Sequence, residues 1–398
     1  MCNTDKFKNF KYLDNLIRSG AKEIVLDHDI ILDDEEVTDY TNGIRLDDND
    51  LTIDGNGHTI DANGKTPIFF CTSQNIIIKN ILLKNGFTED AGGIISNVFG
   101  ELTIMKSTLT NNKAEKGGAI LNYGKLNIVD STLSKNTAEK GGAIYNKSKL
   151  YLINTILTEN TAKEYGGSIF NDGQMLNSGR LIISESTITK NTAKSGGAVY
   201  NVKGELTINE TKLTNNKAEK GGAILNNGNF SITKSTLNKN TAEEGGAIYT
   251  NVDFNIVESI FIENKAKNGG AVYNTNMLTI TESTLKKNTA EKGGAIYNRL
   301  FGNVTINEST LTENTAKNGG AIYNHRAKFS IAKSTLSKNN ANIGGAISNF
   351  KGELTTTLST LTENTARLGG AILNIKEINF EHIKCEFKNN KSNDVEFK

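Results

Sequence analysis

The chain has 398 residues, and its 45 Lys and Arg residues nearly balance 44 Asp and Glu residues, for a formal net charge of +1. A near-neutral chain is a poor match for nucleic acid or an anionic membrane surface as its main partner. The 38 Gly residues, with one Pro and no Trp, favour tight turns between many strands. The three cysteines, Cys2, Cys71 and Cys385, form neither a disulfide framework nor a metal knuckle, and we expect them to stay unpaired within one chain.

The N-terminal segment, residues 1–20, is expected to be a capping helix. Its apolar residues recur at helical spacing and end at Gly20: Phe7, Phe10, Leu13, Leu16 and Ile17. A helix at this position would cover the open strand edge of the first coil. No apolar run in the sequence is typical of a signal peptide or a membrane span.

Residues 21–91 are expected to form the first coils of a solenoid. Two acidic runs in this part, Asp33–Glu36 and Asp47–Asp50, carry the oxygen ligands that Ca²⁺ prefers. Because neither run has a spaced loop motif, we interpret both as solvated turns and predict no metal and no cofactor.

Residues 92–398 are organised by twelve Gly-Gly pairs, whose first glycines stand 24 to 30 residues apart. They are Gly92, Gly117, Gly141, Gly166, Gly196, Gly221, Gly245, Gly269, Gly293, Gly319, Gly344 and Gly369. A period of this length is the signature of a stacked solenoid. We therefore expect residues 92–398 to be one continuous repeat domain.

One repeat, Leu278–Asn298, contains three short pieces with alternating apolar residues: Leu-Thr-Ile, Ser-Thr-Leu and Ala-Ile-Tyr. Three short strands per coil predict an all-β, right-handed parallel β-helix of about 14 coils, because crossovers between parallel strands are right-handed. Strand alternation places Ile120, Ile144 and Ile296 inside. Two columns of Asn, which include Asn288 and Asn298, fall at the corners and are interpreted as side-chain ladders that tolerate a left-handed corner.

Variation in repeat length falls mostly in one turn, which lies between the second Asn column and the next Leu. This turn is longest from Asp172 to Arg180. Because solenoids place recognition in loops that vary over a fixed scaffold, Asp172, Gln174 and Arg180 are candidate contact residues. The alternative is that a surface turn simply tolerates insertion.

Outward strand positions carry no cluster of carboxylates, which β-helix enzymes that cleave polysaccharides use for catalysis. We therefore identify no catalytic residue. One column of outward positions is aromatic: Tyr249, Tyr273, Tyr297 and Tyr323 fall on four consecutive coils. Tyr combines an apolar ring with a polar tip, so these four residues are the candidate ligand-binding platform. The alternative is that the rings only stack on one another.

The Gly-Gly-Ala-(Ile/Val) element, with Phe-x-x-Asn matches at Phe261–Asn264 and Phe387–Asn390, resembles the repeats of polymorphic outer-membrane proteins. It also resembles adhesin-like surface proteins of methanogenic archaea, and Leu51–Asp61 is similar to the first coil of pectate-lyase-like β-helices. The resemblance implies a non-catalytic, adhesin-like protein at the cell surface or outside the cell, although the sequence carries no recognised export signal or anchor.

The expected partners are a glycan or a protein on a host or partner cell, with neither nucleic acid nor a membrane span involved. End-to-end self-association at the C-terminal edge is a further expectation, because an open strand edge can pair with another chain. Two alternatives stay open at this point: a polysaccharide lyase or glycoside hydrolase on the same scaffold, and a structural spacer.

Overall fold

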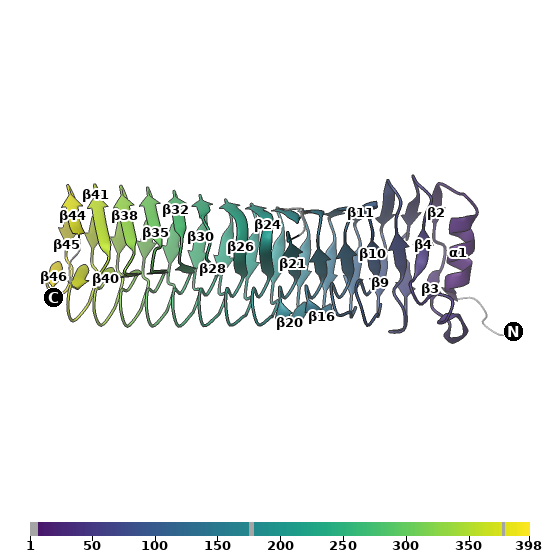
Figure 1. Ribbon diagram of the computed structural model, residues 1–398, viewed down its shortest axis with the longest axis horizontal. Coiled ribbons are helices and arrows are strands. Elements are labelled where there is room, and N and C mark those ends of the chain that lie inside the picture. The colour runs from purple at the N-terminus through teal and green to yellow at the C-terminus, as the bar shows by residue number, and fades with distance from the viewer. Residues whose placement is uncertain (1–6, 175–178, 376–378) are drawn as a thin grey trace. The chain divides into compact units, whose positions relative to one another are not determined.

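The computed structural model describes residues 7–174, 179–375 and 379–398. The chain forms two compact units, one of residues 1–194 and 198–205, the other of residues 195–197 and 206–398. In each unit the strands stack in parallel, every strand pairing with its equivalent one coil along (Figure 1). This confirms the predicted all-β parallel solenoid with three short strands per coil. The right-handed sense stays a prediction.

The predicted N-terminal helix is present as α1 (Phe10–Arg18), with Phe10, Leu13 and Ile17 buried. It begins later than expected, because β1 (Phe7–Lys8) pairs with β3 (Asp29–Ile31). The nearly buried carboxylate of Glu36, in a short 3-10 turn (Asp34–Glu36), accepts hydrogen bonds from the backbone N–H groups of Phe10 (3.1 Å) and Lys11 (2.9 Å). An anion there satisfies free amides at the helix start and fixes α1 against its coil.

The strands of the first unit follow three faces. The first face, of the Leu-Thr-Ile type, consists of β2 (Glu23–Val25), β5 (Thr52–Asp54), β8 (Ile76–Lys79), β11 (Glu101–Met105), β14 (Lys125–Val129), β18 (Lys149–Ile153) and β22 (Arg180–Ser184). The second face consists of β1, β3, β6 (Thr59–Asp61), β9 (Leu82–Lys84), β12 (Thr108–Thr110), β15 (Thr132–Ser134), β19 (Ile156–Thr158) and β23 (Thr187–Thr189). The third face consists of β4 (Ile44–Leu46), β7 (Phe69–Cys71), β10 (Ile95–Asn97), β13 (Ile120–Asn122), β17 (Ile144–Asn146) and β21 (Ile169–Asp172). A separate pair, β16 (Thr137–Lys140) and β20 (Thr161–Tyr165), lies in the turns before Gly-Gly, and β24 (Val199–Asn209) has residues in both units.

The second unit repeats the three faces. Its first face consists of β26 (Ile224–Thr233), β29 (Phe254–Val257), β32 (Met277–Thr281), β35 (Asn303–Asn307), β38 (Lys328–Ala332), β41 (Glu353–Thr357) and β44 (Asn379–Ile383). The second face consists of β25 (Lys212–Thr214), β27 (Thr236–Asn238), β30 (Ile260–Ile262), β33 (Thr284–Lys286), β36 (Thr310–Thr312), β39 (Thr335–Ser337), β42 (Thr360–Thr362) and β45 (Glu386–Lys388). The third face consists of β28 (Ile248–Thr250), β31 (Val272–Asn274), β34 (Ile296–Arg299), β37 (Ile322–His325), β40 (Ile347–Phe350), β43 (Ile372–Ile375) and β46 (Val395–Phe397).

The core of each unit is filled by inward residues from all three faces. Ile120, Ile144 and Ile296 are completely buried, which confirms their predicted orientation. Pairing is in register, so that Val272 pairs with Ile296 and Asn274 with Asn298. Burial of one such aliphatic side chain contributes about 1.5–3 kcal/mol, and the contribution is repeated on every coil.

The Gly-Gly turn requires both glycines for different reasons. The first, such as Gly293 with φ +62°, adopts the left-handed region that favours glycine. The second cannot carry a side chain, because a Cβ on Gly294 would lie 2.0 Å from the carbonyl oxygen of Gly320. The pair therefore marks the place where neighbouring turns of the backbone meet most closely.

Both Asn columns are buried hydrogen-bond ladders, as predicted. The Nδ2 of Asn264 donates to the Oδ1 of Asn288 at 3.0 Å, and Asn298 donates to Asn324 at 2.9 Å. The left-handed corner, however, is not at the Asn of the first column. It is adopted by the preceding residue, for example Lys287 with φ +54° before Asn288. The Asn is thus retained for its amide and not for its tolerance of a left-handed backbone.

Candidate functional site

The Tyr ladder, which is Tyr249, Tyr273, Tyr297 and Tyr323, lies on β28, β31, β34 and β37 of the second unit. Its rings stand on the outer side of the strands, as alternation predicts, with centroids 4.9 to 5.4 Å apart along the ladder. Three of the rings are covered, however: the exposed fraction is 1 % for Tyr273, 7 % for Tyr297 and 9 % for Tyr323, and only Tyr249 is half-buried. Of the four candidate ligand-binding residues, Tyr249 is therefore the one with appreciable exposed surface, and ligand binding by the ladder stays a prediction.

Cationic side chains cover the Tyr ladder from the neighbouring turns. Lys220 lies 5.2 Å from the ring centroid of Tyr249, and Lys292 lies 5.7 Å from that of Tyr323. The guanidinium of Arg299 donates to the hydroxyl of Tyr273 at 2.9 Å. Cation–π contacts and a charge-assisted hydrogen bond hold the rings in place. Burial raises the pKa of Tyr297 to about 12.

The long turn predicted as a candidate contact loop begins at a buried carboxylate in the first unit. Asp172 is 8 % exposed and accepts a 2.8 Å hydrogen bond from the hydroxyl of Tyr145, and Lys147 lies 3.7 Å from it. The backbone N–H of Gln174 also donates to Asp172, at 3.1 Å. At the other end, Arg180 pairs with Glu205 at 3.3 Å. Residues 175–178 of this turn lie outside the described part, and the described contacts are those of a turn fastened at both ends.

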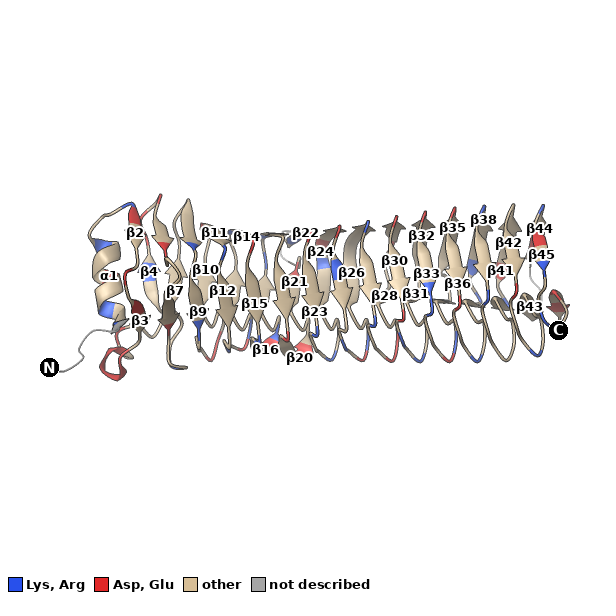
Figure 2. Ribbon diagram, turned by 180° about the vertical axis from the view of Figure 1, so that it is seen from behind, with Lys and Arg blue, Asp and Glu red and all other residues tan. Residues whose placement is uncertain are grey.

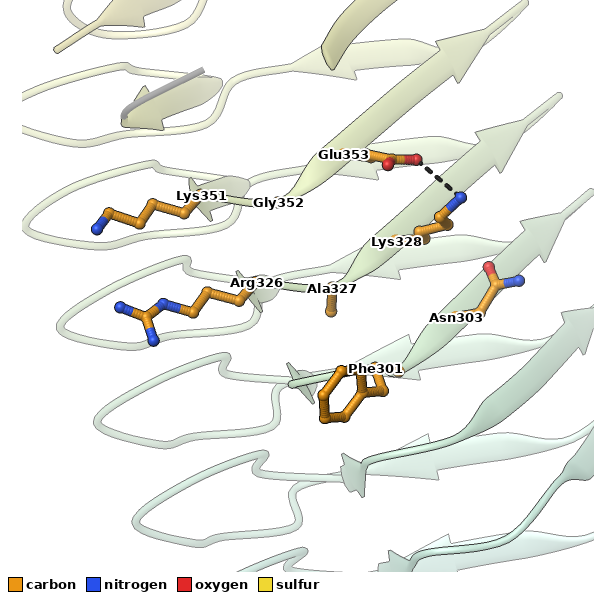
Figure 3. A pocket seen from close by; sticks show the side chains of 9 residues that line it. Phe301, Asn303, Arg326, Ala327, Lys328, Lys351, Gly352 and Glu353 are labelled. Carbon is orange, nitrogen blue, oxygen red and sulfur yellow. Dashed lines mark ion pairs between the residues drawn. The ribbon is translucent and has the colours of Figure 1, made fainter. Parts of the chain in front are cut away.

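Side chains at the equivalent turn of the second unit surround a hollow of about 300 Å³ (Figure 3). We call it the turn hollow and define it by Phe301, Arg326, Lys328, Lys351 and Glu353. Phe301 is 89 % exposed. Lys328 pairs with Glu353 at 3.2 Å, whereas among the described residues no carboxylate pairs with Arg326 or Lys351. Figure 3 shows Arg326 and Lys351 extending in the same direction from adjacent coils.

The floor of the turn hollow consists of small residues for a structural reason. A Cβ on Gly302 would lie 1.9 Å from the Oδ1 of Asn298, and one on Gly352 would lie 2.3 Å from the Nδ2 of Asn324. The Asn ladder behind the turn therefore excludes larger residues. Phe301 and Arg326 on the rim are exposed, so packing does not dictate their identity.

Sequence reasoning identified this class of turn but not the residues of the turn hollow. One signal was available, because the turn after Asn298 is longer than its neighbour after Asn324 and contains an isolated Phe followed by Gly. The first unit has the same Phe-Gly pair at Phe99-Gly100, and Phe99 is 76 % exposed.

Two carboxylates of the acidic runs near the N-terminus are engaged in local structure. Glu36 binds the start of α1, and Asp47 pairs with Arg45 at 2.9 Å. No group of three or more His, Cys, Asp or Glu side chains in the described ranges could hold a metal ion. Figure 2 shows Lys, Arg, Asp and Glu interspersed along the turns. Cys71 and Cys385 are free thiols, Cys2 lies outside the described residues, and burial raises the pKa of Cys71 to about 11.

Comparison with known families identifies the repeat itself. The Chlamydia polymorphic membrane protein repeat matches six segments, residues 130–147, 185–202, 234–251, 258–275, 282–299 and 308–325. The chain is a parallel β-helix protein whose repeats are similar to those of polymorphic membrane proteins. No curated protein and no solved structure matches the chain significantly. No helix in the described residues is both long and apolar enough to cross a membrane.

The matched segments coincide with residues that build the coil. Segment 282–299 contains the inward Leu285, the ladder residue Asn288, the Gly293-Gly294 turn and the inward Ile296. These positions are buried or sterically restricted. The match therefore defines the scaffold, and repeats of this family suggest a surface or adhesin-like protein.

Proposed function

We propose that the protein is a non-catalytic, adhesin-like surface protein that recognises a glycan or a protein surface. The observation that carries this proposal is the set of six polymorphic membrane protein repeats. The residues shared by these repeats are buried in the packed coils. We therefore assign recognition to exposed side chains at the turns, which can vary without disturbing the scaffold.

Exposed residues in the turns that lead from a third-face strand to the next first-face strand support this assignment. Phe99 in the first unit and Phe301 in the second are large apolar residues at this corner, and both are mostly exposed. Exposed aromatic residues on rigid turns are typical anchors of recognition surfaces. The Tyr ladder is the weaker candidate, because only Tyr249 offers appreciable exposed surface, and its main role is to stiffen the third face.

The test applies the full chain to a glycan array and to a panel of cell-surface protein ectodomains, with a polysaccharide-cleavage assay on every glycan that binds. We expect saturable binding to at least one class and no cleavage products. Formation of reducing ends or unsaturated sugars would support the alternative of a lyase or hydrolase. Absence of binding to both the glycan array and the ectodomain panel would support the alternative of a structural spacer.

A further inference from the structure

The turn hollow of the second unit combines a cationic rim with an exposed aromatic ring. Arg326 and Lys351 occupy equivalent positions on adjacent coils, because the N–H of Arg326 donates to the carbonyl of Phe350 and the N–H of Lys351 donates to that of Ile375. Adjacent coils of a parallel stack lie about 4.8 Å apart. The two cations therefore form a short column on the two coils that follow the turn of Phe301 (Figure 3).

Within the described ranges this column has no carboxylate partner, although Lys351 lies 5.7 Å from the ring centroid of Phe350. Of the defining residues, Glu353 is the only carboxylate, and its partner is Lys328 at 3.2 Å. Burial and then the neighbouring Arg326 and Lys292 lower the pKa of His325, which lies next to the turn hollow. A cation without a carboxylate partner keeps its affinity for an external anion, and guanidinium binds carboxylate and sulfate groups in a fork geometry.

From these observations we propose that the turn hollow binds an acidic glycan, with Arg326 and Lys351 on its carboxylate or sulfate groups and Phe301 against the apolar face of a sugar ring. This inference rests on the proposed function and names its ligand class.

Two other polyanions fit the turn hollow less well. A peptide that binds a β structure gains affinity from backbone hydrogen bonds, but the N–H groups of Arg326 and Lys351 already donate to neighbouring coils. Nucleic acid is bound through many phosphate contacts, whereas the turn hollow offers two cations without a carboxylate partner in the described ranges, and the whole chain has a formal net charge of +1. Recognition by a few side chains and one ring suits a sugar.

The experiment measures binding of the full chain to immobilised heparin, polygalacturonate and neutral dextran, with polyglutamate and duplex DNA as competing polyanions. We expect binding to heparin, to polygalacturonate or to both, which identifies sulfate or carboxylate as the preferred anion. Dextran, polyglutamate and DNA should bind much more weakly. Binding should also weaken as salt is raised, because exposed charge pairs are screened.

Two variants and a matched control locate the site. R326E/K351E should weaken binding at least about tenfold, and F301S should weaken it several-fold, because charge and ring contribute separately. R326Q/K351Q, which removes charge without reversing it, should lose less. The control K217E/K265E makes the same change in net charge at exposed lysines of the same unit. This control should bind like the unaltered chain.

Three results would overturn the inference. One is absence of binding to both acidic glycans, and another is equal binding to polyglutamate or DNA. The third is an equal loss of binding in K217E/K265E and R326E/K351E. If the chain then still bound a neutral glycan or an ectodomain, the proposed function would stand and only this site would fall. Absence of binding to every glycan and ectodomain tested would contradict both this inference and the proposed function.

Discussion

Two sets of aromatic residues in the second unit lie close together in sequence but differ in exposure. Tyr297 belongs to the ladder on β34 and is 7 % exposed, whereas Phe301 follows on the turn and is 89 % exposed. Each ladder ring has a ring neighbour on an adjacent coil, and cations contact Tyr249, Tyr273 and Tyr323. Phe301, in contrast, is an additional residue in a turn. A residue type that recurs on every coil is therefore one that the solenoid needs for packing. A residue that departs from the repeat, such as Phe301, is left exposed and available to a partner.

Removing a side-chain amide from an Asn ladder should cause the largest loss of unfolding free energy. In N288A, the backbone N–H and Nδ2 of Asn264 lose their acceptor and the carbonyl of Phe261 loses its donor, all in buried surroundings. Unpaired buried groups of this kind cost about 1–3 kcal/mol each, so we expect a loss of about 4 kcal/mol in unfolding free energy. Urea denaturation followed by circular dichroism measures it. N303A, at an exposed Asn, is the control, and an equal loss there would contradict the assignment.

Removing a covered ring of the Tyr ladder should have the next largest effect. Y273A leaves a cavity between Tyr249 and Tyr297 and frees Arg299 from its hydrogen bond. Truncation of a buried aromatic residue costs about 3–5 kcal/mol, and the outward position places Y273A near the lower end of this range. The same denaturation measurement applies. A variant as stable as the unaltered chain would show that the ladder is an open surface.

Alkaline pH should lower the unfolding free energy through the buried ladder residue Tyr297. The pKa of Tyr297 is about 12 in the folded chain, mainly through burial, and close to about 10 when unfolded. Between these values the unfolded chain binds fewer protons than the folded chain, so the unfolding free energy falls as pH rises. Its stabilising contribution is fully present below about pH 10. Y297F should show a shallower decline, and an identical slope in both chains would exclude Tyr297 as a source.

The smallest effect on stability is expected at the turn. F301S should change the unfolding free energy by no more than about 0.5 kcal/mol, because an exposed side chain away from packing contributes little. Its thermal unfolding midpoint should match that of the unaltered chain, even though its glycan binding is weakened. Destabilisation comparable to that of Y273A would mean that Phe301 is a packing residue and would remove the contrast between the two regions.

Much of the fold was predictable because each structural constraint recurs on every coil. The Gly-Gly spacing gave the stack, and alternation placed Ile120, Ile144 and Ile296 inside. The residue that adopts the left-handed corner before Asn288 was not predictable from propensity, because Lys287 has a side chain that disfavours this conformation. The next coil's hydrogen bonds decide it, and those are long-range contacts.

The candidate site was predictable only in part. Alternation gave the face of Tyr273, but its exposure depends on the cation and rings supplied by neighbouring coils, which strand periodicity does not include. The repeat spacing located the variable turn in the sequence, and its role in recognition stays a prediction. The pairing of Lys328 with Glu353, which leaves Arg326 and Lys351 without a carboxylate partner in the described ranges, depends on register between turns and became visible only in the structure.

The Asn ladder has a consequence for how such a protein changes over time. Each amide donates to the following coil and accepts from the preceding one, as Asn264, Asn288 and Asn314 do in succession. In this first Asn column, internal coils such as those of Asn264, Asn288 and Asn314 therefore present the same donor on one side and the same acceptor on the other, whereas Thr250 interrupts the second column. Duplication or deletion of one whole coil would rejoin identical partners and leave no amide unsatisfied. Gene-level gain or loss of repeats can thus alter the number of coils while the chemistry of each junction stays the same.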